Sequence, residues 1–109
     1  MAYSEALAAR VRAALAEQGG VSERRMFGGL CIMVHGNMAL GVIGEELVVR
    51  VGPDAYADAL AHPDARPMDF TGKQLKGLVY VSAAGVASDD ALADWIFRGL
   101  AFVTELPPK

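Results

Sequence analysis

The sequence predicts one α+β domain, in which an antiparallel sheet of four to five strands is flanked by three helices. Three observations predict this class. A segment with apolar residues at helical spacing lies near each end of the chain. The middle consists of short apolar runs that are separated by glycine-containing turns. Successive strands follow one another before a helix intervenes, which is typical of α+β proteins and not of a parallel α/β sheet.

The first predicted element is a helix over residues 4–18. Ser4 suits the N-cap and Glu5 suits the first turn, because both complement the free N–H groups at a helix start. Gly19-Gly20 ends the helix. Its apolar face consists of Leu7, Val11, Ala14 and Leu15.

A meander of three strands is expected next, over residues 30–34, 38–43 and 47–51. Between the first two strands, Gly36-Asn37 suits a two-residue hairpin loop with glycine at its first position. Gly44-Glu45-Glu46 forms the second turn. The segment before the meander, 21–29, is mostly polar and is broken by two glycines, and no strand is predicted there.

The second half is expected to contain a short helix over 53–61, a short strand over 68–70, a polar connection over 71–76 and a strand over 77–81. The sheet is therefore a meander plus a C-terminal strand or hairpin. Ser88 is the predicted N-cap of a last helix that runs to about residue 106. Its wide apolar face consists of Leu92, Trp95, Ile96, Gly99, Leu100, Phe102, Val103 and Leu106.

The composition excludes some classes of function. The chain has 109 residues, 53% of them apolar, which suits one folded domain spanning residues 1–109. Its 10 Lys and Arg stand against 13 Asp and Glu, for a net charge of −3. A module that binds duplex DNA on its own normally carries a basic excess, because phosphate neutralisation supplies most of its affinity. The acidic balance therefore argues against direct DNA binding.

Cysteine usage and the N-terminus indicate a cytoplasmic protein. Cys31 is the only cysteine, so neither an internal disulfide nor a multi-cysteine zinc site can form. The first residues lack the pattern of a signal peptide. Residues 26–44 contain no charged side chain and have the length of a membrane span. Their glycines and the turn at 35–37 divide them into two strands, so no membrane-spanning segment is expected.

The strongest candidate site is Arg24-Arg25 followed by Gly28-Gly29. Guanidinium groups offer forked donors to phosphate or carboxylate, and a glycine pair lets backbone N–H groups approach an anion closely. Lys73 and Lys76 would add positive charge if the fold brought them near. The alternative is that the arginines pair with Glu23 and other acids while the glycines serve a turn. The functional interpretation is an anion or nucleic-acid contact.

The other chemically capable residues favour structural roles. Phe27 and Met26 would frame a pocket at the candidate patch or, in the simpler interpretation, belong to the core. Cys31 lies in an apolar strand and is interpreted as a buried, inert thiol. His35 and His62 are interpreted as surface side chains, because neither has a second ligand at helical spacing. We therefore expect no metal, no cofactor and no catalytic set of nucleophile, base and orienting group.

The segment Glu23-Arg24-Arg25-Met26-Phe27-Gly28-Gly29-Leu30 resembles the signature of the TfoX N-terminal domain family. Further pieces occur in that family's order: the following hairpin, residues 47–51, 67–70 and 79–81, and the opening of the last helix. The resemblance implies an α+β fold. The best-known full-length members regulate natural competence, assist another transcription factor and carry a second, C-terminal domain. The resemblance therefore implies that this chain is a non-catalytic regulatory or protein-interaction module whose partner belongs to the transcription machinery.

The strands also predict self-association. Residues 30–34, 38–43 and 78–81 are nearly continuous apolar runs, whereas an antiparallel sheet with one wet face should alternate. Both faces are therefore expected to be covered. The first and last helices can cover one face, and the short middle helix is too small for the other. A homodimer would hide the remainder.

Overall fold

The computed structural model describes residues 3–26, 28–70 and 73–108 of the chain. In chain order its elements are α1 (Glu5–Ala14), β1 (Val21–Met26), β2 (Gly29–Val34), β3 (Asn37–Ile43), β4 (Glu46–Arg50), α2 (Tyr56–Leu60), β5 (Ala65–Phe70), β6 (Lys73–Val81), a 3₁₀ turn η1 (Ala83–Val86) and α3 (Asp89–Val103). The α+β class is confirmed, with all three helices near their predicted positions.

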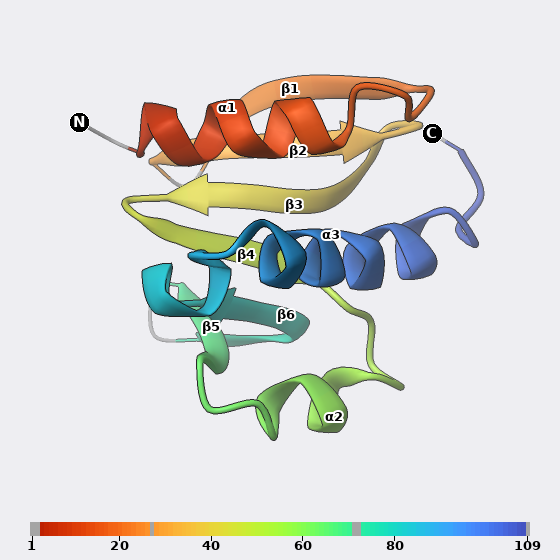
Figure 1. Ribbon diagram of the computed structural model, residues 1–109. Coiled ribbons are helices and arrows are strands. Elements are labelled where there is room, and N and C mark those ends of the chain that lie inside the picture. The colour runs from red at the N-terminus through yellow and green to blue at the C-terminus, as the bar shows by residue number, and fades with distance from the viewer. Residues whose placement is uncertain (1–2, 27, 71–72, 109) are drawn as a thin grey trace.

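A single antiparallel sheet in the order β1-β2-β3-β4-β6-β5 forms the centre of the molecule (Figure 1). It has six strands, one more than the upper end of the prediction. The extra strand is β1, which pairs along its whole length with β2. The C-terminal strands form a hairpin, and β6 lies between β4 and β5. The strands β1 and β5 are therefore the two edges of the sheet.

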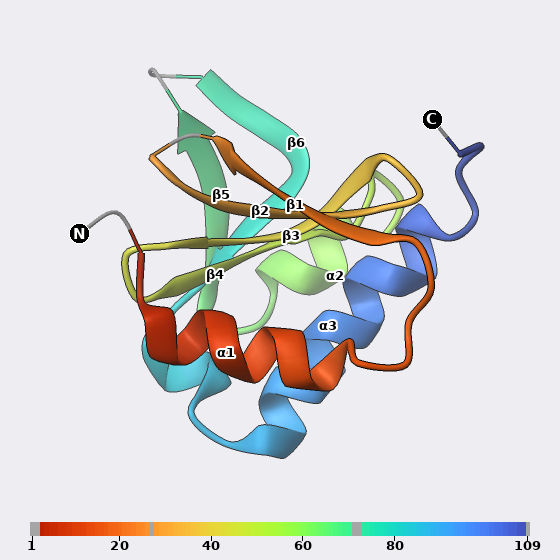
Figure 2. The same ribbon diagram turned by 90° about the horizontal axis from the view of Figure 1, so that it is seen from above.

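The three helices lie on one side of this sheet (Figure 2). One hydrophobic cluster joins residues of all three helices, such as Val11 of α1, Ala59 of α2 and Trp95 of α3, to the strands beneath. Two serines cap helices as predicted: the Ser4 hydroxyl accepts a hydrogen bond from the Leu7 N–H, and that of Ser88 accepts one from the Ala91 N–H, each at 3.1 Å. The first and last helices thus cover one face.

The opposite face of the sheet is closed largely by the sheet itself. Cys31, Val48 and Met68 are at most 2% exposed, yet they lie outside the cluster beneath the helices. The β5–β6 pair rises away from the helix layer, and β6 curves strongly along its length (Figure 2). Gly77, within β6, has a φ of 90°. The side chain of Met38 also lies over Gly41 of the same strand, where an added Cβ would meet its Cε at 3.5 Å. The α2 helix lies with the other helices and takes no part in this cover.

The hairpin between β2 and β3 differs from the prediction by one residue. Its loop consists of His35 and Gly36, with φ angles of 52° and 83°, and not of Gly36-Asn37. Two consecutive positive φ angles match the twist of antiparallel strands. Asn37 begins β3 instead and is only 3% exposed. Its side-chain amide donates a hydrogen bond of 3.0 Å to the carbonyl oxygen of Pro107, which ties the C-terminal segment to the sheet.

Candidate functional site

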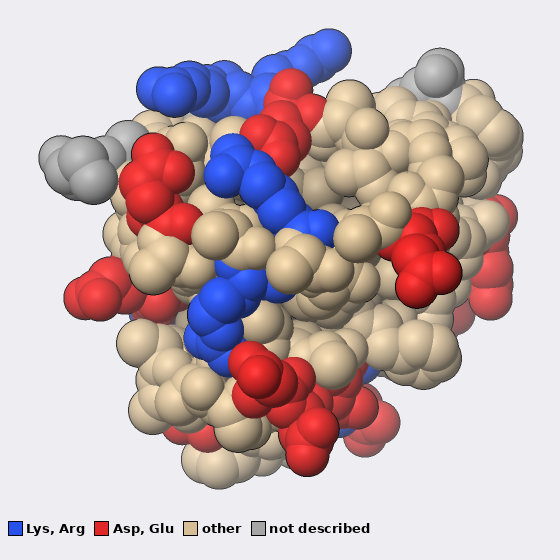
Figure 3. Space-filling view, turned by 45° about the horizontal axis from the view of Figure 1, so that its top comes forward, with Lys and Arg blue, Asp and Glu red and all other residues tan. Residues whose placement is uncertain are grey.

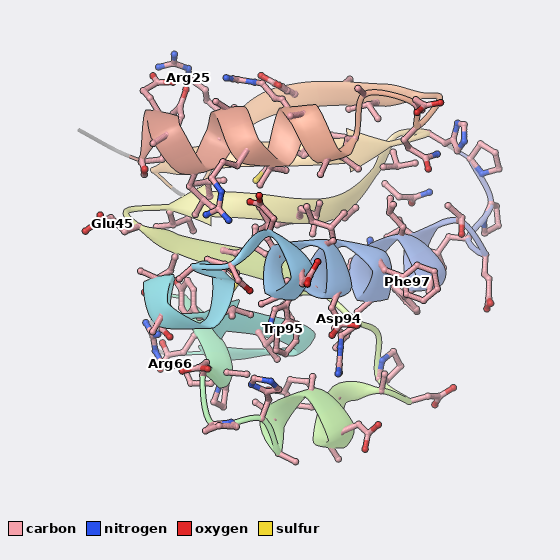
Figure 4. The ribbon with its side chains drawn as sticks, viewed as in Figure 1. Arg25, Glu45, Arg66, Asp94, Trp95 and Phe97 are labelled. Carbon is pink, nitrogen blue, oxygen red and sulfur yellow. The ribbon has the colours of Figure 1, made fainter. Side chains whose placement is uncertain are left out.

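The paired arginines of the β1–β2 hairpin lie on opposite faces of the sheet. Both are exposed residues of the edge strand β1, where successive side chains alternate between faces. Arg24 is paired across the strands with Cys31, whose side chain lies on the face without helices. Arg25 is on the helix side, where its guanidinium carbon lies 5.9 Å from the centre of the Tyr3 ring (Figure 4). The two guanidinium groups therefore do not form one binding fork.

Glu23 pairs with a residue of α1 rather than with its neighbours in β1. Arg12 donates two hydrogen bonds to the Glu23 carboxylate, of 2.6 and 2.9 Å. These bonds hold the pKa of Glu23 below its ordinary value and raise the pKa of Arg12. The pair lies beside a hollow of about 230 Å³, which is lined by Tyr3, Arg12, Glu23, Arg24, Arg25 and Leu30. Charges of both signs meet at this hollow (Figure 3).

The two glycines of the hairpin have different structural tasks. Gly28 has a φ of 72°, is exposed and has open space where a Cβ would lie. Gly29 is buried, and a Cβ there would overlap the carbonyl oxygen of Val42 and lie 2.7 Å from Cγ1 of Ile43. Gly28 thus serves the turn, whereas Gly29 lets β2 approach β3 closely. Both tasks belong to the fold.

A second surface, which we call the helix-layer patch, lies on the outside of α1 and α3. A groove of about 480 Å³ between the helices is lined by Arg10, Ala13, Ala14, Asp89, Leu92 and Ala93. One turn beyond Ala93, Phe97 is 67% exposed and projects from α3 toward solvent (Figure 4). Among the described residues, Val21 at 37% is the only other large apolar side chain with such exposure. Phe97 lies outside the predicted apolar face of the last helix, and it was not among the predicted site residues.

Residues 13–103 match the TfoX N-terminal domain. The chain belongs to the TfoX N-terminal domain family. The match covers most of the 109 residues, as the segment around Arg24 and Gly28 predicted. No curated protein and no solved structure matches the chain.

In this TfoX N-terminal domain, three of the predicted patch residues cannot be placed as side chains. Phe27 lies outside the described residues, as does the Met26 side chain. The backbone of Lys73 and Lys76 forms part of β6, but the side chains of both residues lie outside the described part of the structure. Whether these lysines approach Arg24 or Arg25 therefore stays a prediction.

The remaining candidates of the TfoX domain can be placed. Cys31 is 2% exposed, so its predicted burial is confirmed, and that burial raises the pKa of its thiol. His35 is exposed, as predicted. His62 is instead partly buried, since its ring packs edge-on against Trp95 with 5.1 Å between ring centres. Its Nδ1 lies 4.0 Å from a carboxylate oxygen of Asp64.

The described residues offer neither a metal centre nor a membrane-spanning helix. They contain no group of three or more His, Cys, Asp or Glu side chains placed to hold a metal ion. Each helix in the same part of the chain falls short of the length and apolar character that crossing a bilayer requires.

Proposed function

We propose that this chain is a non-catalytic, cytoplasmic regulatory module that acts by binding another protein, as TfoX-type competence and transcription regulators do. Family membership supports the regulatory class, and the TfoX N-terminal domain is not a known enzyme family. The observation that carries the binding role is the exposure of Phe97. Phe97 is 67% exposed and lies one helical turn from a groove lined largely by apolar side chains, and a contiguous exposed apolar surface of this kind is typical of a contact surface.

The surroundings of Phe97 fit a protein partner better than a charged ligand. Asp94 and Arg98 flank it and form an i,i+4 ion pair of 3.3 Å, so neither sign of charge dominates. The adjacent groove has Arg10 and Asp89 at its rim, joined at 3.2 Å. A surface with an aromatic centre and a rim of mixed charges has the composition of protein–protein contacts.

Site-specific photo-crosslinking tests this function in the native cell. A photoreactive phenylalanine analogue replaces Phe97 in the full chain, and a second strain carries it at Glu45, an exposed turn residue at one end of the sheet (Figure 4). We expect a discrete protein adduct at position 97, whether with a second copy of the chain or with another protein, and none at position 45. Equal labelling at both positions, or no protein adduct at position 97, would contradict the proposal.

A second candidate function is anion or nucleic-acid binding at the β1–β2 hairpin. The observation that favours it is the hollow of about 230 Å³ beside Arg25, whose guanidinium group is exposed above Tyr3. Arg24 and Arg25 both line this hollow, whereas Arg66 lies in β5 at the other edge of the sheet, so substitutions that each remove one positive charge separate this function from general electrostatic attraction. Binding to single- and double-stranded DNA and RNA is measured against salt concentration. Loss of binding with Arg24→Ala or Arg25→Ala together with retention in Arg66→Ala supports a site at the hollow, whereas unchanged binding in the Arg24→Ala, Arg25→Ala double variant excludes it.

A further inference from the structure

We propose that the partner of the helix-layer patch is a second copy of this chain, and that Phe97 of each protomer inserts into the α1–α3 groove of the other. This inference rests on the proposed function, since it names the occupant of the same surface. Its basis is that the patch carries a projection and a recess side by side. Ala93 lines the groove and Phe97 projects one helical turn further along α3.

A two-fold axis makes this arrangement self-complementary. In a symmetric dimer, if a residue of one copy contacts a residue of its partner, the reciprocal contact forms as well. If the two-fold axis passes between the groove and Phe97, the ring of each protomer therefore enters the groove of its partner. A foreign partner would have to supply a matching recess for Phe97 together with a projection for the groove. A second copy supplies both without any further requirement.

The groove has the chemistry to receive an aromatic ring. Ala13, Ala14 and Ala93 are exposed and small, and Leu92 provides a buried apolar wall. Its volume of about 480 Å³ leaves room for a phenylalanine side chain. Aromatic side chains that fill such recesses dominate the energetics of many interfaces.

The charges are also complementary to a copy of the same surface. The Arg10–Asp89 pair lies beside the groove and the Asp94–Arg98 pair beside Phe97. The side chain of Asp89 is 97% exposed and that of Asp94 is 63% exposed, so both carboxylates are accessible. Bringing Phe97 into the partner's groove places one ion pair near the other, where opposite charges can be exchanged between chains. A strongly acidic or strongly basic partner would face repulsion from half of these groups.

The surface around the contact is rich in alanine. Its exposed alanines are Ala6, Ala9, Ala13, Ala14 and Ala16 on the α1 side and Ala93 and Ala101 on α3. An aromatic side chain contributes about 150–250 Å² of buried surface, so two Phe97 rings give roughly 300–500 Å² of the ~1,000 Å² that a stable interface needs. The alanines must supply the remainder. An interface near this lower limit of area is typical of weak or transient contacts, so we expect a Kd on the order of micromolar.

Sedimentation equilibrium or light scattering of the purified full chain over a concentration series tests the inference. The unmodified chain should pass from monomer to dimer in the micromolar range. Phe97→Ala should weaken the dimer by roughly 100-fold or more, because each dimer loses two anchoring rings. Val21→Ala removes the other exposed large apolar side chain, at the edge strand β1, and should leave the Kd unchanged. Far-UV circular dichroism and a thermal melt establish that each variant is folded.

A mixing experiment distinguishes the reciprocal contact from unspecific association. Ala13→Arg blocks the groove but keeps Phe97, whereas Phe97→Ala keeps the groove open. Each variant alone should be monomeric, and an equimolar mixture should form a heterodimer that retains one of the two contacts. A monomeric unmodified chain at several hundred micromolar, or a dimer that Phe97→Ala leaves intact, would overturn the inference. In that event, a crosslink from position 97 to a different protein would leave the proposed binding function standing, and no adduct would end both.

Discussion

Substituting Gly29 by alanine is expected to destabilise the domain strongly, although alanine is one of the smallest possible changes. Gly29 is buried in the first position of β2, beside the backbone of β3. An added Cβ overlaps the carbonyl oxygen of Val42 and approaches Cγ1 of Ile43 to 2.7 Å and its Cα to 3.2 Å. Two of these three atoms belong to the backbone of the neighbouring strand. Relief therefore requires β2 and β3 to separate, and a side-chain rotation does not suffice.

The cost can be bounded from general experience with overpacked interiors. Forcing an extra methyl group into a packed site typically costs about 1–3 kcal/mol, and alanine regains about 0.5–1 kcal/mol because it has less backbone freedom than glycine in the unfolded chain. Because the overlap is with backbone atoms of β3, the upper end of the first range applies, and a net loss of about 2 kcal/mol results. With an unfolding entropy of roughly 2.1 cal/mol/K per residue, this loss lowers the Tm by about 9 °C for a domain of this size.

Gly28 provides the matched control, because it is the adjacent residue and has the opposite constraint. Its φ of 72° disfavours most side chains, but a Cβ would meet nothing within 4 Å. Asparagine tolerates this conformation, so Gly28→Asn should cost only a few tenths of a kcal/mol. Urea titrations and thermal melts of both variants, followed by circular dichroism, check the difference. A Gly29→Ala variant that loses less than about 0.5 kcal/mol, or no more than Gly28→Asn, would refute the steric reasoning.

Three further predictions concern other parts of the structure. Asn37→Ala should lower the free energy of unfolding by roughly 1–2 kcal/mol, because the buried amide no longer donates to the Pro107 carbonyl. The C-terminal segment should then be cleaved faster by proteases, and an unchanged cleavage rate would show that other contacts hold the segment. The pKa of Glu23 is lower in the folded chain than in the unfolded chain. Its interaction with Arg12 therefore stabilises the fold fully at pH values above the pKa of the unfolded chain, and this stabilisation is lost as the pH falls through the pKa of the folded chain. The stability difference between the unmodified chain and Glu23→Gln should therefore shrink from pH 7 toward pH 3 in urea titrations, and a constant difference would contradict this link. Because Cys31 is buried, its thiol should react with a maleimide only when the fold opens, and rapid labelling of the native chain would contradict this burial. Burial also raises the pKa of the Cys31 thiol, so the thiol ionises first in the unfolded chain. The free energy of unfolding should therefore decrease above about pH 8.5.

The spacing of apolar residues predicted most of the helices and strands, but it cannot reveal a strand that has no buried face. The described side chains of β1, from Val21 to Arg25, are all exposed, so no alternation of apolar and polar residues marks it as a strand. Its pairing with β2 follows from tertiary structure and from the turn at Gly28. The second edge strand, β5, contains Pro67 and a bulge before Asp69, and its predicted length was correspondingly too short.

The candidate site was harder to predict than the fold, because side-chain direction depends on element type. Two neighbouring arginines converge in a loop but diverge in a strand, so the unpredicted β1 decides the geometry of Arg24 and Arg25. The partner of Glu23 likewise comes from α1, eleven residues earlier in the chain. The exposure of Phe97 was accessible from the sequence in principle, since helical spacing places it away from Leu92, Ile96 and Gly99. Nothing in the sequence indicated that a groove lies beside it.

Because the curved sheet buries much of its own helix-free face, self-association is expected at the outer surface of the helices and not at that face. Apolar strands predicted a face that a partner must cover, but Cys31, Val48 and Met68 are already buried on the side without helices. The driving force for association must then come from surface that the fold leaves exposed. On the described surface that is above all Phe97, and its helix is held firmly against the sheet, since Trp95 and Ile96 of the same helix are 2% and 3% exposed. A rigid helix presents its aromatic side chain with little loss of conformational freedom on binding, so even a small patch can support a specific contact.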